Sequence, residues 1–161
     1  MKQKSIAEDL GSFLEQFALL YPHYVPSSSS VAPLYLFGES YGGTHVISLA
    51  KHILEHPIHS MKLVGIGIGN GWISPTNHVS YSDFLKNLGL LKDTTYAILR
   101  RNEKIVLDLI QEGEFQKAND HRQNVLTDIL TLLSYTNAYD ITRSQSDLTM
   151  WDFWPFIQKP S

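Results

Sequence analysis

The sequence predicts an α/β fold in its first half and an entirely helical second half. Two apolar runs, at 34–37 and 62–71, alternate with segments of helical periodicity, and this order favours parallel strands in one sheet. A glycine-rich turn at 38–43 joins the first run to the helical segment behind it. No strong strand pattern follows the second run. We therefore expect a partial α/β core over residues 1–79 and a helical region over residues 80–161.

Residues 5–21 are predicted to form an amphipathic helix, because apolar side chains recur at three- and four-residue intervals. Pro22 has no N–H to donate and ends this helix. A solvated loop containing the serine run 27–30 leads to the first strand. A second amphipathic helix follows the glycine-rich turn and ends at Pro57. Its apolar positions are Val46, Ile47, Leu49, Ala50, Ile53 and Leu54.

The second strand, at 62–71, carries glycine at the alternate positions Gly65, Gly67 and Gly69. Their spacing does not satisfy the Gly-x-Gly-x-x-Gly pattern of dinucleotide-binding turns, so we expect no nucleotide site. A strand face without side chains indicates instead that a helix or a backbone segment packs closely against it.

The second half is expected to form three helices. Gly89 and Gly113 are the predicted stops of the first two, and Asp93 is the predicted N-cap of the second. The segment 150–156 is dense in aromatic side chains, which are poorly suited to water. The three helices are expected over 81–88, 93–112 and 114–133.

The composition narrows the range of functions. The chain has 161 residues, of which 43% are hydrophobic, so it can bury an ordinary core. Its net charge of −3, without a basic block, gives no reason to expect a nucleic-acid partner. No window approaches the roughly 18 apolar residues of a membrane span, and the first ten residues are too acidic for a signal peptide. The chain has no cysteine, so it has neither a disulfide framework nor thiol chemistry. We also expect no cofactor.

The turn at 38–43 reads Gly38-Glu39-Ser40-Tyr41-Gly42-Gly43. An apolar strand that runs into Gly-x-Ser-x-Gly and then into a helix is the nucleophile elbow of the α/β-hydrolase fold, with Ser40 as the nucleophile. Because such a turn leaves little room, glycine is expected two residues before the serine, at Gly38, and two after it, at Gly42. Free N–H groups at the start of the helix can hold an oxyanion. The alternative is an ordinary glycine-rich turn.

No histidine of this chain is expected to complete a catalytic triad with Ser40, because none lies in a loop that follows a core strand. The pair His52 and His56 could in principle hold zinc, but no His-Glu-x-x-His arrangement supports this, so we expect no metal. Solvent-facing positions are predicted for His45, His52, His56, His59 and His121.

With these residues in view, the chain resembles the serine carboxypeptidases, in particular their retinoid-inducible and vitellogenic-like types. The family's nucleophile motif, Gly-Glu-Ser-Tyr-Ala/Gly-Gly, matches 38–43, including a glutamate and a tyrosine that a generic elbow does not require. Further segments are similar to family blocks in the same order along the chain. These are 13–24, 65–75, 81–91 and 137–141.

The resemblance implies part of an α/β-hydrolase fold followed by a helical cap insertion. It also implies that the chain is an internal fragment of a longer enzyme. The family's upstream Trp-x-Asn-Gly-Gly-Pro-Gly block supplies an oxyanion N–H and an asparagine that binds the substrate carboxylate, and its triad Asp and His follow the cap. None of these is expected here, and Asp140 is interpreted as structural. The fragment alone is expected to be inactive.

By the same resemblance, Ser40 forms an acyl-enzyme and the Tyr41 backbone N–H stabilises the oxyanion. Glu39, with Gly38 and Asn70, is assigned to substrate binding, and the glutamate pairs with the upstream asparagine around the terminal carboxylate. Two carboxyl groups can share a site only when one holds a proton, so an acidic optimum is expected. The implied partner is a peptide or protein C-terminus, and the implied location is the secretory pathway, lysosomal or extracellular.

Several alternatives stay open. Another α/β-hydrolase, such as an esterase or acyltransferase, would share the elbow but has no need for Glu39. A truncated product without catalysis would share the elbow as well. A separate alternative for Glu39 is that it only caps the following helix. In an isolated fragment, two parallel strands with unpaired edges are expected to aggregate or to stay molten.

Overall fold

The structure is a computed structural model that describes residues 3–25, 31–133, 137 and 139–144. The chain divides into two units, residues 1–75 and residues 76–161. The predicted serine loop at 27–30 and the aromatic segment at 150–156 lie outside the described residues.

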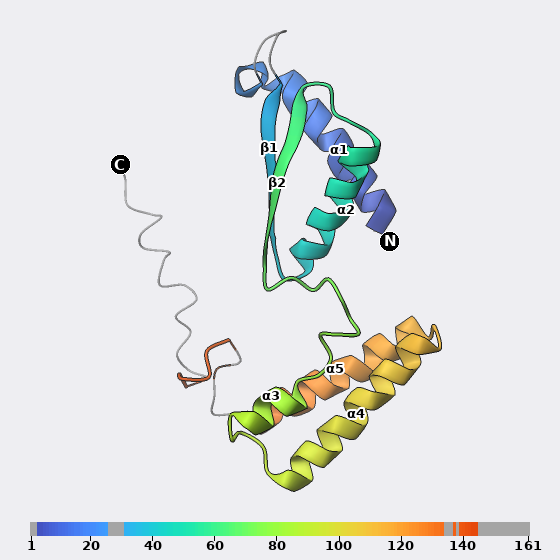
Figure 1. The fold of residues 1–161 in the computed structure, drawn as a ribbon, viewed down its shortest axis with the longest axis vertical. Coiled ribbons are helices and arrows are strands. Elements are labelled where there is room, and N and C mark those ends of the chain that lie inside the picture. Colours follow the sequence, from blue (N-terminus) through green and yellow to red (C-terminus); the bar gives the residue numbers. More distant parts are fainter. Residues whose placement is uncertain (1–2, 26–30, 134–136, 138, 145–161) are drawn as a thin grey trace. The chain divides into compact units, whose positions relative to one another are not determined.

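The first unit is a two-stranded parallel sheet with two helices on one of its faces (Figure 1). The order of its elements confirms the expected mixture of alternating helices and strands, and each helix begins and ends within a few residues of the predicted positions. The elements are α1 (Gln3–Leu20), the 3-10 helix η1 (Pro22–Tyr24), β1 (Ala32–Glu39), α2 (Tyr41–Glu55) and β2 (Met61–Gly69).

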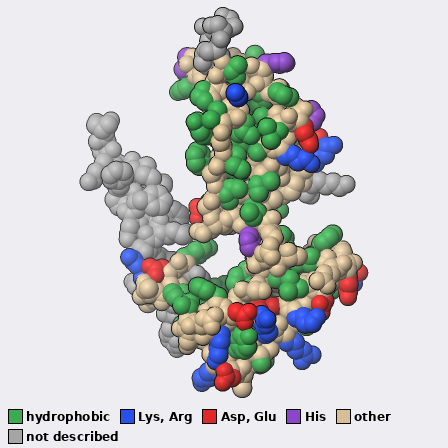
Figure 2. Space-filling model, in the orientation of Figure 1, with side chains coloured by type: hydrophobic (Ala, Val, Ile, Leu, Met, Phe, Trp, Pro, Cys, Tyr) green, Lys and Arg blue, Asp and Glu red, His purple; other side chains and the backbone are tan. Residues whose placement is uncertain are grey.

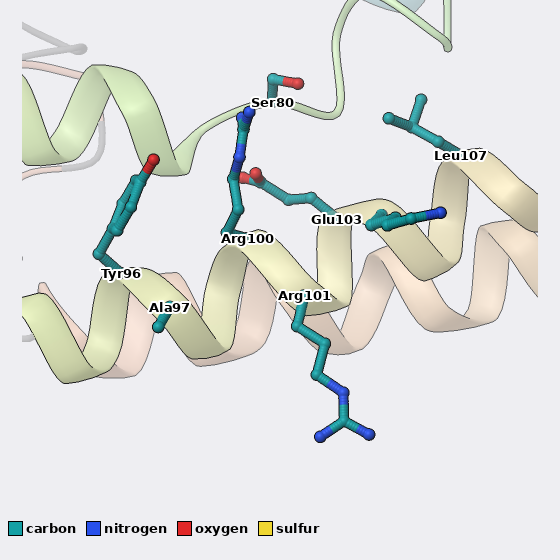
Figure 3. A pocket seen from close by; sticks show the side chains of 8 residues that line it. Ser80, Tyr96, Ala97, Arg100, Arg101, Glu103 and Leu107 are labelled. Carbon is teal, nitrogen blue, oxygen red and sulfur yellow. The ribbon is translucent and has the colours of Figure 1, made fainter.

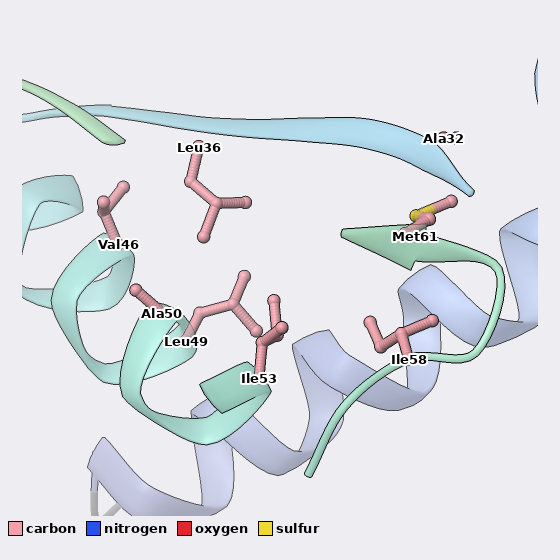
Figure 4. Packing of buried hydrophobic residues seen from close by; sticks show 8 residues of the cluster. All are labelled: Ala32, Leu36, Val46, Leu49, Ala50, Ile53, Ile58 and Met61. Atoms are coloured by element: carbon pink, nitrogen blue, oxygen red, sulfur yellow. The ribbon is translucent and has the colours of Figure 1, made fainter. Parts of the chain in front are cut away.

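The core of this unit lies between the sheet and the helix that connects the two strands (Figure 4). Alternate residues of β1 point to this side, while one apolar stripe of α2 faces them. Leu10, Leu14 and Phe17 of α1 add partly buried side chains to the same cluster. The buried members are Ala32, Leu36, Val46, Leu49, Ala50, Ile53, Ile58 and Met61.

The glycines of β2 lie under aromatic side chains of β1, on the face that α1 and α2 do not cover. The strands pair Tyr35 with Gly65 and Phe37 with Gly67, after a register shift between Leu34 and Tyr35. A Cβ atom on Gly67 would stand 2.5 Å from the Phe37 ring, and one on Gly65 would stand 3.2 Å from the Tyr35 ring. The expectation of a helix or backbone segment against these glycines was therefore wrong, because the room is taken by neighbouring aromatic rings.

This second face of the sheet is apolar and open to solvent in the part of the chain that the structure describes. The Tyr35 side chain is 56% exposed and that of Phe37 is 78% exposed. Hydrophobic side chains gather over this unit, whereas charged side chains of both signs cover the helical one (Figure 2). Since two strands with one covered face are marginal in water, we expect this unit alone to aggregate or to stay molten.

Helix α1 packs closely on α2 through small side chains. Ala7 and Gly11 are its buried residues. A Cβ atom on Gly11 would stand 2.9 Å from the imidazole of His52, so the ring fills the space that a larger residue would occupy. The prediction that His52 faces solvent is wrong, because its ring is half-buried between the helices.

The second unit contains three helices among its described residues: α3 (Ser82–Asn87), α4 (Asp93–Gln111) and α5 (Phe115–Leu132). Each lies within about two residues of its predicted range. Apolar residues of all three helices and of the intervening segments form the interior. The buried hydrophobic residues are Val79, Leu85, Leu91, Leu99, Val106, Ala118, Val125, Ile129 and Leu133.

Glycine ends two of these helices as predicted. Gly89 and Gly113 have φ of 73° and 78°, and each lies in a six-residue turn typical of the Schellman motif. In these turns the N–H of the following residue donates to the carbonyl five positions earlier, Leu90 to Leu85 and Glu114 to Leu109.

The predicted N-cap at Asp93 is wrong by one position, because Lys92 is the N-cap and Asp93 is the first helical residue. The Asp93 carboxylate instead accepts a hydrogen bond from Lys86 Nζ of α3. That hydrogen bond and the charge of Lys86 hold the pKa of Asp93 below its usual value of 3.8. The Asp93 carboxylate therefore stays ionised in mildly acidic solution, and its ion pair with Lys86 continues to join α3 to α4.

Glu103 is a buried carboxyl group that the sequence did not reveal. It lies in the middle of α4 with 2% of its surface exposed. Its Oε1 accepts the backbone N–H groups of Tyr81 and Ser82, both at 2.7 Å, and its Oε2 accepts the Ser82 hydroxyl at 2.5 Å. A side chain of α4 thereby satisfies the free N–H groups at the start of α3. Figure 3 shows Glu103 extending from α4 on the side of Ser80.

No helix among the described residues is long and apolar enough to cross a membrane.

We expect Glu103→Ala to loosen the start of α3, because two N–H groups and a hydroxyl lose their acceptor and Ser82 is fully buried. An unsatisfied buried donor costs about 1–3 kcal/mol, so amide exchange at Ser82 should accelerate by at least about tenfold. Hydrogen exchange of peptides that cover 80–88 measures this. Glu112→Ala, at an exposed position at the end of the same helix, is the matched control. Equal exchange in the two variants would show that Glu103 does not hold α3.

Candidate active site

Ser40 lies between the last residue of β1 and the first residue of α2, with φ 54° and ψ −122°. A residue other than glycine at such angles costs about 1–3 kcal/mol and persists only where its surroundings fix it. The sharp turn ends the strand and starts the helix within one residue. The strand, turn and helix expected around Ser40 are therefore present.

Three backbone hydrogen bonds fix Ser40. Its N–H donates to Gly69 O at 3.0 Å, which continues the ladder between the strands by one position. Its carbonyl accepts from Trp72 N at 2.8 Å and from Gly43 N at 3.1 Å. The Thr44 hydroxyl also donates to Trp72 O. The segment after β2 thus holds the turn that follows β1.

The fixed carbonyl of Ser40 determines where the next N–H points. In a trans peptide the C=O and the N–H lie on opposite sides of the bond. Because the Ser40 carbonyl is directed at Trp72 and Gly43, the Tyr41 N–H faces the other way. Tyr41 is also the first residue of α2, so its N–H has no acceptor one turn earlier in the helix. No described residue accepts a hydrogen bond from it, so it is available as a donor beside Ser40.

Two glycines are required by the crowding in this turn, and they are not the pair that the sequence pattern predicts. A Cβ atom on Gly38 would stand 2.5 Å from Gly42 O, and one on Gly43 would stand 2.8 Å from Ile68. A Cβ atom on Gly42 would meet nothing within 4 Å. The expectation of crowding is confirmed at Gly38 and wrong at Gly42. Gly43 takes that role because β2 passes directly beneath it.

Glu39 is the last residue of β1, and Asn70 directly follows the last residue of β2. Glu39 pairs with Gly69, and the Cγ of Glu39 lies 3.8 Å from the position of a Cβ on that glycine. Asn70 follows with φ 44°, the second positive φ at a residue other than glycine in the described chain. The exposed Glu39 borders an open hollow of about 410 Å³ that Gly38 and Gly69 also line. Glu39 therefore lies at the edge of a shallow, solvent-open surface at the ends of the two strands.

The side chain of Tyr41 is held by α1, which the sequence did not predict. Gln3 Nε2 donates to the Tyr41 hydroxyl at 3.0 Å, and Gln3 Oε1 lies 3.1 Å from His45 Nδ1. The rings of Tyr41 and His45 meet edge to face, with centroids 5.2 Å apart. The contact joins residues about 40 positions apart, so no local pattern could have signalled it.

The histidines fall into two groups. His56 and His59 are exposed as predicted, but His45 and His121 are partly buried, and the predictions for these two were wrong. His121 Nε2 is buried without a hydrogen-bond partner among the described residues. Within the described part of the chain, no hydrogen bond joins a histidine to Ser40, and no group of three or more His, Cys, Asp or Glu is placed to hold a metal ion.

Asp140 is engaged in its own turn. Its Oδ1 accepts the N–H and the hydroxyl of Thr142, and its Oδ2 lies 3.1 Å from Arg143 Nε. The hydrogen bond from the Thr142 hydroxyl is the largest of the effects that lower the pKa of Asp140. These local contacts agree with a structural role.

A larger hollow of about 680 Å³ lies along α4 in the helical unit (Figure 3). Its cations are largely matched by acids, since Arg100 pairs with Asp83 at 2.6 Å and Lys104 pairs with Asp108 at 2.7 Å. The Tyr96 hydroxyl also donates to Asp83, a contact that raises the pKa of Tyr96. Arg100 and Lys104, two of the three cations that line this hollow, therefore already have acidic partners.

Comparisons with known proteins agree on one family. The sequence model of the serine carboxypeptidases matches residues 1–154. A pheromone-processing carboxypeptidase of Schizosaccharomyces japonicus is 28% identical, over 94% of this chain and 30% of its own length. The probable serine carboxypeptidase CPVL of Mus musculus is 29% identical, over 98% of this chain and 34% of its own length. The chain spans about a third of the length of these relatives.

We expect Gly38→Ala and Gly42→Ala to have opposite effects. The first sets a methyl group against the Gly42 carbonyl, which cannot move without breaking the turn, and should lower the free energy of unfolding by about 3 kcal/mol. The second adds a methyl group in open space on a helix and should raise it by up to about 1 kcal/mol. Urea unfolding of the complete enzyme measures the free energy of unfolding of both variants. Similar losses in the two variants would contradict the described packing of the turn.

Proposed function

Because the chain belongs to the serine carboxypeptidase family, we propose that it carries the nucleophile elbow of an enzyme that removes C-terminal residues from peptides. The observation that supports this most is the Ser40 backbone, which stands at a positive φ between a strand and a helix. A serine on such a turn projects its hydroxyl away from both elements. The second support is the Tyr41 N–H, directed away from the fixed Ser40 carbonyl.

In this proposal Ser40 Oγ attacks the carbonyl carbon of the last peptide bond. A tetrahedral intermediate forms, and its negative oxygen is stabilised by the Tyr41 N–H. Collapse of the intermediate expels the C-terminal amino acid and leaves an acyl-enzyme on Ser40, which water then hydrolyses. The histidine that takes the serine proton and passes it to the leaving amino group, and the acid that orients this histidine, are assigned outside this chain.

Glu39 gives the proposal its substrate class. It is exposed at the end of β1 and borders the open hollow beside Gly38 and Gly69. A protonated carboxyl group there can donate a hydrogen bond to the terminal carboxylate of a peptide, which an ester without a carboxylate would not use. Asn70 follows the strand residue paired with Glu39, and we assign it to the same binding region.

We also propose that residues 80–161 form a cap over the active site of the complete enzyme. The described residues of this region form helices and no strand, which suits a separate layer rather than an extension of the sheet. By family resemblance we assign the complete protein to the secretory pathway, as a lysosomal or extracellular enzyme.

Replacement of Ser40 tests the nucleophile. In the complete enzyme, Ser40→Ala should abolish labelling by a fluorophosphonate and reduce kcat on a peptide by at least about 10⁴-fold, because no acyl-enzyme can form. Ser12→Ala, on the exposed side of α1, should label like the wild type. The readout is the mass of the labelled tryptic peptide. Label that persists in Ser40→Ala would show that another residue is the nucleophile.

Replacement of Glu39 tests the carboxylate-binding role. An amide donates a hydrogen bond without a titrating proton, so in Glu39→Gln the fall of kcat/KM on peptides with rising pH should begin at least about one pH unit higher than in the wild type. A neutral ester substrate should show no such difference between wild type and variant. If both enzymes give the same pH profile on peptides, Glu39 does not bind the terminal carboxylate.

A further inference from the structure

The backbone of Trp72 is held on both sides, by the turn at Ser40 and by α2. Its N–H donates to Ser40 O at 2.8 Å. Its carbonyl accepts a hydrogen bond from the hydroxyl of Thr44, a residue in the first turn of α2. The Thr44 side chain thereby ties the segment that follows β2 to the helix that follows the Ser40 turn.

We propose that Thr44 is a positioning residue for the reaction. Its hydroxyl holds the Trp72 backbone in place. The Trp72 N–H in turn fixes the Ser40 carbonyl, and the plane of that peptide sets the direction of the Tyr41 N–H. This inference rests on the proposed function of Ser40 and Tyr41. Thr44 touches none of the reacting atoms in this proposal and acts through the Trp72 backbone.

Trp72 matters because it reaches the Ser40 carbonyl from outside the turn. The other donor to this carbonyl, Gly43 N at 3.1 Å, belongs to the first turn of α2 and moves with the turn. The Trp72 N–H comes instead from the segment beyond β2, and it fixes the carbonyl relative to the sheet. A displacement of Trp72 therefore rotates the peptide plane between Ser40 and Tyr41.

The segment around Trp72 lies beyond the end of the strand. β2 ends at Gly69, so the ladder between the strands does not reach residues 71–73. The Ile73 N–H donates to Gly71 O at 3.1 Å and closes a three-residue turn with Trp72 at its centre. This bond shapes the turn but does not join it to another element. The Thr44 hydroxyl supplies such a connection.

Close packing between glycines brings Thr44 to Trp72. A Cβ atom on Gly43 would stand 3.0 Å from Gly71 Cα, so the first turn of α2 lies directly against the segment after β2. Thr44 and Trp72 each follow one of these glycines, and both are half-buried. A hydrogen bond in such a place competes with less water than one on the surface.

Replacement of Thr44 in the complete enzyme tests the proposal. Thr44→Val keeps the shape of the side chain and removes the hydroxyl, so kcat on a peptide should fall by about three- to tenfold. The rate of inactivation by a fluorophosphonate should fall by a similar factor, because its phosphoryl oxygen takes the place of the oxyanion. Thr44→Ala also removes the hydroxyl and should act in the same way. Ser48→Ala is the matched control, because the Ser48 hydroxyl donates within α2, to Thr44 O at 2.9 Å.

Thr44→Ser separates the hydrogen bond from the packing of the methyl group. Serine can donate from the same position on the helix, so this variant should recover at least half of the kcat that Thr44→Val loses. A serine variant as slow as Thr44→Val would show that the methyl group matters rather than the hydrogen bond, and the proposal would be wrong.

The outcomes distinguish this inference from the proposed function. Wild-type kcat and inactivation in Thr44→Val, with Ser40→Ala inactive, would overturn the positioning role and leave the nucleophile in place. A higher KM for peptides with kcat and inactivation unchanged would also overturn it, because the hydroxyl would then serve substrate binding. Activity in Ser40→Ala would overturn the proposed function itself.

Discussion

The backbone of Ser40 is the constraint on which the rest of the first unit depends. A positive φ at a serine is unfavourable, and it is held by three backbone hydrogen bonds, to Gly69 at the end of β2, to Trp72 in the segment that follows, and to Gly43 of α2. Parallel pairing of β1 with β2 is needed to bring Gly69 and Trp72 to this turn. The core beneath the sheet and the packing of α1 on α2 then keep these elements in register.

Glycine has two different uses around this turn. Gly38 leaves room for the backbone of Gly42, and Gly43 leaves room for the side chain of Ile68. As a result β1, α2 and β2 can meet at one point. Gly65 and Gly67 make room for the rings of Tyr35 and Phe37 on the open face of the sheet. The first use serves the candidate site, and the second gives the sheet an aromatic surface whose exposure is a liability for this unit alone.

Local signals predicted most of the fold, because they concern neighbours in the chain. Helical periodicity located α1, α2, α4 and α5, and glycine marked the ends at Gly89 and Gly113. Contacts between distant segments were missed: Glu103 bound to the start of α3, and Gln3 bound to Tyr41. The Gly-x-Ser-x-Gly pattern located Ser40 but gave the wrong second glycine, because the strand that crowds Gly43 comes later in the sequence.

A crystal structure of the complete enzyme with a phosphonate bound at its active site would show whether Ser40 is the nucleophile and Tyr41 the oxyanion donor. We expect phosphorus bonded to Ser40 Oγ, a phosphonyl oxygen within hydrogen-bonding distance of the Tyr41 N–H, and a Ser40 φ that stays positive. We also expect the Thr44 hydroxyl still to donate to Trp72 O. An adduct on another residue, or a Ser40 that relaxes to a negative φ while it carries the phosphonate, would contradict these assignments.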